Sequence, residues 1–130
     1  MSHFSTVKTE LRQLGPLMTA LEDLGYSPEQ GERQIRGYRG QTVQADISVE
    51  VKEGGDIGFR WNVQSGVYEL VTDLDLWKQQ IPVERFLTRL TQRYALNTVL
   101  SASLQEGFQV EKQINLQNGG IELVVTRWDA

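Results

Sequence analysis

The segment 43–51 constrains the fold of this chain more than any other. Its apolar positions are Val43, Ala45, Ile47, Val49 and Val51, and polar residues stand between them. Strict alternation with period two predicts a β-strand that has one buried and one solvated face, as in an antiparallel sheet. Residues 52–56, Lys-Glu-Gly-Gly-Asp, have the composition of a hairpin turn, and the alternation resumes over 57–63. With a third strand between residues 67 and 76, the centre of the chain is predicted to be an antiparallel meander.

Two segments follow the helical spacing of three and four instead. Apolar residues between 14 and 24 share one stripe, with Pro16 in the first turn and Gly25 as a left-handed C-cap. A second helix is predicted from Pro82, with an apolar face that extends to Tyr94. The apolar phase shifts after Tyr94, so we expect a bend or a second short helix over 95–106, although a single kinked helix also fits.

The remaining segments are predicted to be strands or loops. Alternation from Phe4 allows an opening strand of about seven residues, and the glycine-rich stretch 27–40 fits a loop or a short exposed strand. Residues 110–116 and 121–127 flank Asn118-Gly119, a strong signal for a type I′ hairpin because both central residues need positive φ. Apolar residues fall on both faces of the last strand, which is expected to be central in a sheet or covered by a partner.

These elements predict one α+β domain over residues 1–130, with a mostly antiparallel sheet of about five to six strands and two or three helices on one face. Leu24-Gly-Tyr26 and Glu106-Gly-Phe108 repeat the pattern of a helix end, a glycine and an aromatic residue before a strand. Two strand-helix-strand halves would give a ferredoxin-like sandwich. A curved sheet with extra strands fits almost as well.

Composition limits the chemistry. A chain of 130 residues with 39% apolar content can bury one core without staples. The absence of cysteine excludes disulfides, thiolate metal sites and cysteine nucleophiles, and a lone histidine, His3, excludes a histidine-rich metal site within one subunit. We therefore expect no catalytic residues, no metal and no cofactor.

Charge and hydropathy limit the partners. A net charge of −4 argues against general nucleic-acid binding, which depends on clustered lysine and arginine. No apolar run reaches the roughly 18 to 20 residues that span a bilayer. The first residues lack the charged and apolar regions of a signal peptide, so we expect the protein to stay in the compartment where it is made.

Residues 33–39, Arg-Gln-Ile-Arg-Gly-Tyr-Arg, form the segment most typical of a binding site. The guanidinium groups of Arg33, Arg36 and Arg39, with Tyr38, could hold a phosphate or a partner carboxylate through forked hydrogen bonds. In the alternative interpretation, the arginines of a solvated loop pair with Glu29, Glu32 or the carboxylates of the sheet.

Other polar and aromatic residues receive a structural or a binding interpretation. The polar-face residues Asp46, Ser48 and Glu50, with Glu53 and Asp56 in the next turn, are interpreted as solvated, because alternate strand residues lie about 7 Å apart and cannot chelate one ion tightly.

Phe59 and Trp61 are assigned to the core. Trp77, in a polar neighbourhood, and Trp128, beside the C-terminus, are predicted exposed anchors for a partner, with the rim of the core as the alternative.

Several short strings together carry a family resemblance. They are Met1–Thr9, Leu24–Tyr26, Asp56–Phe59, Gln92–Ala95 with Thr98-Val99, Gly107-Phe108 and Arg127-Trp128. The set resembles the hypothetical chloroplast reading frame thirty-five family of cyanobacteria and algal plastids, also catalogued as a domain of unknown function. That resemblance spans almost the whole chain. It implies a cyanobacterial cytoplasm or a plastid stroma as the location, and it brings no agreed activity, cofactor or catalytic residue.

Two functional hypotheses follow. The first is a non-enzymatic adaptor that binds an unidentified protein through a sheet face or edge, with Trp77, Trp128 and the arginine segment as contacts. The second is a small enzyme or ligand-binding protein, as a single chain or as a homodimer, whose pocket lies between sheet and helices and is lined by Arg36, Tyr38, Asp46 and Glu50.

Overall fold

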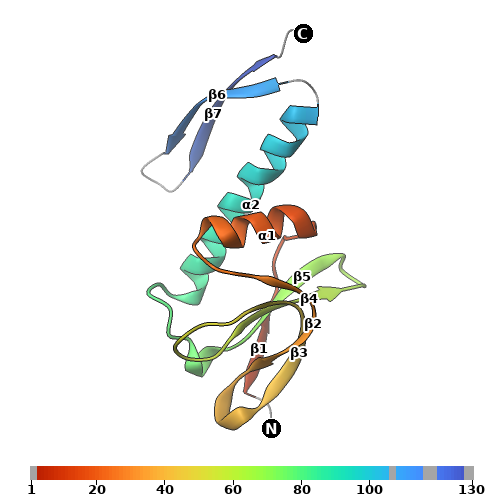
Figure 1. Cartoon of the computed structure of the whole chain (residues 1–130), viewed down its shortest axis with the longest axis vertical. Helices are drawn as coiled ribbons and strands as arrows, with labels where there is room; N and C mark the ends of the chain where they lie inside the picture. Colours follow the sequence, from red (N-terminus) through yellow and green to blue (C-terminus); the bar gives the residue numbers. More distant parts are fainter. Residues whose placement is uncertain (1–2, 106–107, 116–119, 128–130) are drawn as a thin grey trace.

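The computed structural model describes residues 3–105, 108–115 and 120–127. Its main sheet contains β1 (Phe4–Val7), β2 (Glu29–Arg36), β3 (Thr42–Val49), β4 (Ile57–Asn62) and β5 (Val67–Asp73). All four pairings are antiparallel, in the order β1-β5-β4-β3-β2. Two helices, α1 (Leu14–Asp23) and α2 (Val83–Gln105), and the hairpin of β6 (Phe108–Asn115) and β7 (Ile121–Arg127) complete the fold (Figure 1). The α+β class and the meander of β3, β4 and β5 are confirmed.

The first helix ends as its sequence predicts. Gly25 adopts φ 92°, a left-handed conformation that glycine reaches without steric cost. Its N–H donates to the carbonyl oxygen of Glu22 at 2.9 Å, and the Tyr26 N–H donates to that of Leu21 at 3.0 Å. These two bonds make a Schellman motif, which satisfies carbonyl groups that the helix end would otherwise leave unpaired. At the other end, the Tyr94 hydroxyl of α2 accepts the backbone N–H groups of residues 12 and 13 at 3.1 and 2.9 Å.

The prediction of a separate short helix over 95–106 is wrong, and the alternative of one helix through this region fits the structure. A single helix, α2, runs from Val83 to Gln105, through the point at which the apolar phase shifts. The shift instead marks a change of surroundings along one helix. Phe86 and Leu90 are buried in the main core, whereas Val99 and Leu104 farther along are exposed.

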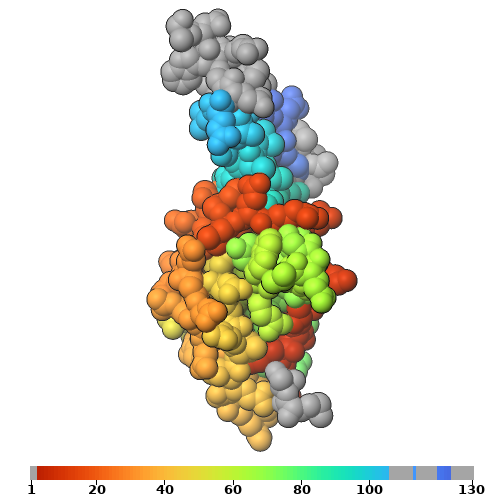
Figure 2. Space-filling model, turned by 90° about the vertical axis from the view of Figure 1, so that its right-hand side faces the viewer, coloured from red at the N-terminus to blue at the C-terminus, as the bar shows by residue number. Residues whose placement is uncertain are grey.

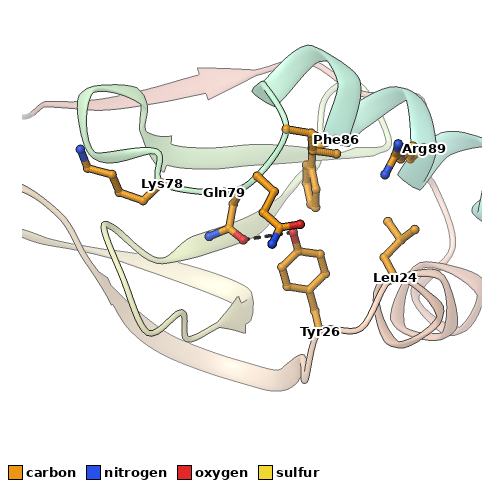
Figure 3. A pocket seen from close by; sticks show the side chains of 8 residues that line it. Leu24, Tyr26, Lys78, Gln79, Phe86 and Arg89 are labelled. Carbon is orange, nitrogen blue, oxygen red and sulfur yellow. Dashed lines mark hydrogen bonds between the residues drawn. The ribbon is translucent and has the colours of Figure 1, made fainter.

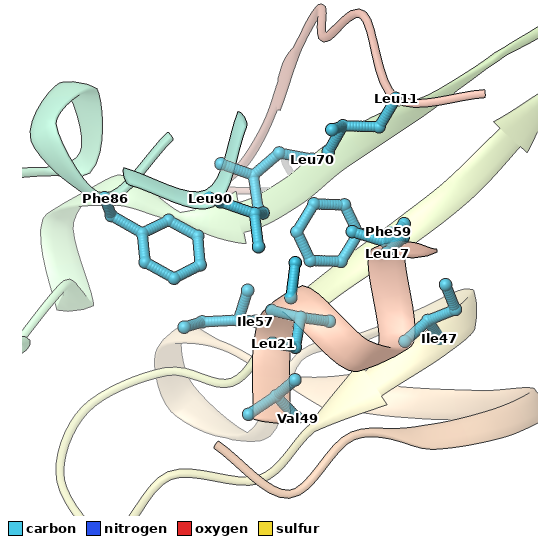
Figure 4. Close-up of a cluster of buried hydrophobic side chains, with 11 residues drawn as sticks. Leu11, Leu17, Leu21, Ile47, Val49, Ile57, Phe59, Leu70, Phe86 and Leu90 are labelled. Atoms are coloured by element: carbon cyan, nitrogen blue, oxygen red, sulfur yellow. The ribbon is translucent and has the colours of Figure 1, made fainter. Parts of the chain in front are cut away.

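Both helices cover the same face of the sheet. The buried core joins residues of α1 and α2 to the inward side chains of β3, β4 and β5 (Figure 4). Its members, all fully or almost fully buried, are Leu11, Leu17, Ala20, Leu21, Ile47, Val49, Ile57, Phe59, Leu70, Phe86 and Leu90. The cross-strand pairs Ile47 with Phe59 and Phe59 with Leu70 place the largest of these side chains on one face, as the alternation predicts.

The opposite face of the sheet carries a second, smaller cluster. Ile35, Ala45 and Val71 are buried together there, and Phe4 and Val43 pack against them. A Cβ atom on Gly58 would lie 2.8 Å from Ile35 Cδ1 and 2.9 Å from Ala45 Cβ, so the β2–β3 hairpin lies directly over the backbone of β4. The distal half of this hairpin therefore curls across the second face of the sheet.

The curl begins where β3 leaves β4. The backbone pairing of the two strands ends at Ile47 and Phe59. Beyond it, the Trp61 N–H donates to the Asp46 carboxylate at 2.7 Å in place of a backbone carbonyl group of β3. Beyond this point β3 turns Ala45 toward the second cluster, whereas Ile47 faces the main core. The sheet is thus strongly curved, which matches the alternative prediction of a curved sheet, and the ferredoxin-like arrangement is not confirmed.

Several other boundaries differ from the predictions. The opening strand has four residues rather than about seven, and the stretch 27–40 contains a strand of eight residues, β2, most of whose side chains are exposed. β7 is not central, because within the described residues it pairs with β6 in a separate two-stranded sheet. Asn118-Gly119 and Trp128 lie outside the described residues.

Candidate functional site

The arginine segment and a buried carboxylate meet at the end of the curled hairpin. Asp56 is only 2% exposed, and its two carboxylate oxygens accept the Arg36 backbone N–H at 2.8 Å, the Nε at 3.0 Å and the Nη2 at 2.9 Å. Burial raises the pKa of Asp56, but the hydrogen bonds and the positive charge of Arg36 outweigh this effect and hold the pKa below its ordinary value. This arrangement stabilises a charged pair and locks β2 against the loop before β4.

A second buried carboxylate lies nearby. Asp73 is fully buried, and it accepts the Tyr38 N–H at 3.0 Å and the Asp75 N–H at 3.1 Å. The buried Thr72 hydroxyl donates to the Asp56 carbonyl oxygen at 3.0 Å. Each of these polar groups has a backbone partner, as buried polar groups require, so the cluster holds chain segments together.

The predicted arginine site does not converge on one point. Arg33 and Arg36 lie in β2 rather than in a loop, and Arg39 lies in the short 3₁₀ turn Tyr38–Gly40. Arg33 pairs with Glu29 at 2.5 Å, as the alternative interpretation predicts, and Arg36 pairs with Asp56. The Arg39 guanidinium lies over the Tyr38 ring, 5.1 Å from its centre. Each guanidinium group thus already has a partner within the chain.

Trp61 is more exposed than predicted, whereas Trp77 lies at the rim of the core, as the alternative interpretation predicts. Trp61, assigned to the core, is 39% exposed and packs edge-on against Tyr68. Trp77 is half-buried at the rim of the core. Its indole N–H donates to the Ile81 carbonyl oxygen at 2.8 Å, and its ring contacts Phe86. The indole of Trp77 is therefore held in place, and one part of it reaches the surface.

A cavity of about 340 Å³ opens beside Trp77, between the end of α1, the segment 78–81 and the start of α2 (Figure 3). We call it the Tyr26 cavity. Its lining residues are Leu24, Tyr26, Lys78, Gln79, Gln80, Ile81, Phe86 and Arg89. The Tyr26 hydroxyl donates to Gln79 Oε1 at 3.2 Å, and the Tyr26 and Phe86 rings meet edge-on with centres 5.5 Å apart. Burial raises the pKa of Tyr26, so its hydroxyl stays protonated and remains a donor.

The charge of this cavity has one sign. Lys78 and Arg89 lie toward opposite ends of it, and no carboxylate lines it (Figure 3). Among the ion pairs of the described residues, neither Lys78 nor Arg89 takes part. A cavity with an apolar aromatic floor and two cations free of ion pairs suits an apolar group that carries a carboxylate.

The residues predicted to line a pocket between sheet and helices, in the second hypothesis, do not lie together. Asp46 binds the Trp61 N–H, and Tyr38 binds Asp73 through its backbone. Glu50 lines a different cavity, of about 350 Å³, together with Glu29, Arg33, Gln34, Ile35, Ser48 and Asp56. Within the part of the chain that the structure describes, no group of three or more His, Asp or Glu side chains is arranged to hold a metal ion.

Sequence reasoning missed most of the Tyr26 cavity. It singled out Trp77 beside it, but Tyr26 and Phe86 carried only fold signals, one after a helix cap and one on a helix stripe. Arg89 is one of three arginines spaced four residues apart in α2, and nothing local in the sequence distinguishes it from Arg85 or Arg93. The one available signal was the polar run Lys78-Gln79-Gln80 directly after an aromatic residue.

Together, the fold and the site define a small α+β protein with a curled antiparallel sheet, buried polar groups that serve the fold, and a cationic cavity at the surface. Among the described residues, no helix is long and apolar enough to cross a membrane. No solved structure matches the chain. The family model described as "Protein of unknown function (DUF1257)" matches residues 20–124.

Named relatives agree with this match over nearly the full length. The chain is 41% identical to the "Uncharacterized protein ycf35" of Guillardia theta, over 98% of each protein. It is 35% identical to the ycf35 proteins of Pyropia yezoensis, over 99% of each, and of Cyanophora paradoxa, over 98% of each. The chain therefore belongs to the DUF1257 family, the uncharacterised ycf35 proteins, and the resemblance seen in its sequence is confirmed.

Proposed function

We propose that this protein is a non-enzymatic adaptor that binds another protein through the Tyr26 cavity. The observation that supports this proposal is the combination of Lys78 and Arg89, both free of ion pairs among the described residues, with an apolar floor that contains no acid. In a chain whose net charge is −4, such a local excess of positive charge favours an acidic partner.

The shape of the surface favours a peptide segment. A neighbouring depression of about 460 Å³ shares Tyr26, Lys78, Gln79 and Gln80 with the cavity and continues it toward the loop after β3, where Glu50 and Glu53 line it beside Lys52. The part that would receive acidic side chains is therefore the Tyr26 cavity itself, which no carboxylate lines. Together the cavity and the depression form an extended surface, whereas 340 Å³ alone is near the lower limit of about 300 Å³ for small-molecule sites. The proposed ligand is a segment with one apolar side chain, held against Tyr26 and Phe86, and carboxylates that meet the two cations.

A non-enzymatic role agrees with the use of the buried polar groups. Asp56, Thr72 and Asp73 are buried polar residues, as catalytic residues often are. Their hydrogen bonds, however, go to backbone N–H and carbonyl groups of neighbouring segments. Trp77 supports the cavity from the side through its contact with Phe86. Contacts through Arg33, Arg36, Tyr38, Arg39 and Trp128 remain predictions.

We also propose that the protein works in the cytoplasm of a cyanobacterium or in a plastid stroma. The support comes from membership of the ycf35 family and from algal relatives such as that of Guillardia theta. Immunodetection in fractionated cells tests this location, which would be wrong if the protein sedimented quantitatively with membranes.

A charge reversal tests the adaptor proposal. Arg89→Glu places an acid in the cavity, whereas Arg85→Glu makes the same change of charge one helical turn away, at an exposed residue that does not line it. Wild type and both variants are incubated with cyanobacterial extract and analysed by native mass spectrometry. We expect a stoichiometric protein partner with wild type and with Arg85→Glu, and at least tenfold less of it with Arg89→Glu, because a like charge would then face the acidic ligand.

Other results would contradict the proposal. A partner that is retained equally by Arg89→Glu would place the binding surface elsewhere. Absence of any stoichiometric protein, with a small molecule retained by wild type and lost in Arg89→Glu, would favour the alternative of a ligand-binding protein or small enzyme with a pocket between sheet and helices.

A further inference from the structure

Ser48, in β3, is a buried polar residue whose side chain has no partner in the described part of the chain. It is 7% exposed, and its hydroxyl forms no hydrogen bond with residues 3–105, 108–115 or 120–127. The other buried polar residues in these ranges, Asp56, Thr72 and Asp73, all form such bonds. Because an unpaired hydroxyl is unfavourable inside a protein, Ser48 points to a group that is bound from outside the chain.

The Ser48 side chain points into the cavity of about 350 Å³ that Glu50 also lines, which we call the Ser48 cavity. Its neighbours in β3, Ile47 and Val49, both belong to the main core, and successive strand residues point to opposite faces of a sheet. The Ser48 hydroxyl therefore lies on the second face, where the buried Ile35 gives the cavity an apolar wall. A hydroxyl and an apolar surface thus line the same space.

The charge of the Ser48 cavity is negative. Glu29, directly opposite Ser48 in the β2–β3 pairing, forms an ion pair with Arg33 at 2.5 Å, and these two charges cancel. Asp56 is paired with Arg36 at 2.9 Å, whereas Glu50 takes part in no ion pair among the described residues.

The Arg36 guanidinium serves two carboxylates and leaves one negative charge over. The hydrogen bond and the charge of Asp56 raise the pKa of Arg36 most, and Glu50 makes a smaller electrostatic contribution. Lys52, two residues after Glu50, lines the neighbouring depression rather than this cavity. Glu50 is therefore the carboxylate that is available to an incoming cation.

We propose that the Ser48 cavity binds a primary ammonium group on an alkyl chain. An ammonium group donates three hydrogen bonds and accepts none, which suits the Ser48 hydroxyl and the Glu50 carboxylate as acceptors. Its alkyl chain would lie against Ile35. A metal ion suits the cavity less, because no three His, Asp or Glu side chains in the described ranges are arranged to hold one. This site is distinct from the Tyr26 cavity, whose charge has the opposite sign.

Nuclear magnetic resonance titration of the isotope-labelled protein tests the ligand class. The probes are butylamine and a short acetylated peptide that contains one lysine, and butanol is the uncharged control. We expect saturable shifts of the Ser48 and Glu50 amide signals with butylamine and none with butanol. Tighter binding of the peptide would identify a protein side chain as the source of the ammonium group, and tighter binding of butylamine would identify a free amine.

Variants of the two acceptors test the site. Glu50→Gln should weaken butylamine binding tenfold or more and Ser48→Ala about threefold or more, because each removes an acceptor of the charged group. Glu53→Gln removes an exposed carboxylate that does not line this cavity, and it should bind like wild type. Ser48 lines neither the Tyr26 cavity nor the depression beside it, so the result for Ser48→Ala is independent of the adaptor proposal. Absence of saturable binding, equal shifts with butanol, or binding that both acceptor variants retain would overturn the proposal.

The stability of Ser48→Ala provides a second measurement. Without an amine, its thermal midpoint should equal or exceed that of wild type, because an unpaired buried hydroxyl has been removed. Butylamine should then raise the midpoint of wild type more than that of Ser48→Ala, since a ligand stabilises the fold that binds it. A lower midpoint for Ser48→Ala without amine would show that the hydroxyl already has a partner, such as an ordered water molecule, and would overturn the proposal.

Discussion

At the residue scale, Asp56 connects three parts of the chain. Its carboxylate binds Arg36 in β2 and lies 3.5 Å from the Val51 N–H in the preceding loop. Its carbonyl oxygen accepts the Thr72 hydroxyl of β5. In the sequence, Asp56 is one of several acidic residues in a turn. In the structure, it holds the curled hairpin against the rest of the sheet.

The buried Asp56 predicts a pH dependence of stability. Because the pKa of Asp56 in the folded state is lower than its ordinary value, its ionised form stabilises the fold at pH values above about 3.9, and this contribution is lost as the pH falls through the folded-state pKa. Asp56→Asn should lower the free energy of unfolding at pH 7 by roughly 1–3 kcal/mol, since charged hydrogen bonds become neutral ones.

Urea unfolding at pH 7 and pH 3 measures this difference. The gap between wild type and Asp56→Asn should narrow at pH 3, because this pH lies below the pKa of about 3.9 of an aspartate in the unfolded chain and part of the stabilisation by the ionised carboxylate is then lost. Glu53→Gln, an exposed acid in the same loop, serves as the control and should change little at either pH. A gap that stays constant between the two pH values would contradict the assigned role.

At the element scale, the curl of the β2–β3 hairpin depends on the bare backbone of β4. Ile35 and Ala45 lie where a side chain of residue 58 would have to be. The Asp46 carboxylate supports the same curl by satisfying the Trp61 N–H that β3 leaves unpaired. Glycine at position 58 is therefore required by the packing of the hairpin on β4. Its backbone conformation alone does not require glycine, because its φ is not positive.

Gly58→Ala tests this dependence. The added methyl group should overpack the second cluster and lower the free energy of unfolding by roughly 1–3 kcal/mol. Gly15→Ala is the matched control, because Gly15 lies in α1 with open space around it and alanine is the better helix former, by up to about 1 kcal/mol. Thermal unfolding should move in opposite directions for the two variants. A neutral Gly58→Ala would mean that the hairpin does not press on β4.

The curl also shows where the alternation of β3 stops being informative. Period two predicted the strand correctly, but it placed Ala45 and Ile47 on one face, whereas the structure packs them in different clusters. A change of face within one strand depends on where the neighbouring strand departs, and this departure leaves no mark on the order of apolar and polar residues. Trp61 shows a different limit of the same pattern, because it has the period of the buried Phe59 and yet is 39% exposed beside Tyr68.

At the scale of the whole molecule, the chain consists of a well-packed body and a less supported arm, the C-terminal half of α2 with β6 and β7, which stands out from the body (Figure 2). The body has helices over one face of the sheet and its own curled hairpin over the other, whereas the arm has a helix and a two-stranded sheet (Figure 1). Local stability should follow this difference, because segments with few buried apolar contacts open more readily.

Hydrogen exchange measured by mass spectrometry tests this difference. Amides of β6 and β7 should exchange at least tenfold faster, as an order of magnitude, than those of β4 and β5 in dilute protein. Equal protection of arm and body in dilute protein would show that the arm is as stable as the rest.

The sequence by itself determined the kinds of element and their order, because the periods of two and three to four residues, the glycine after α1 and the hairpin signals are local properties of the chain. It also determined the absence of disulfides and the family. Only the tertiary structure decided that Asp56 meets Arg36, that the Tyr94 hydroxyl holds the start of α1, and that Lys78 and Arg89 line one cavity. These contacts join residues as far as 82 positions apart, and they follow from how the sheet curls and where the helices cross it, which no local pattern encodes.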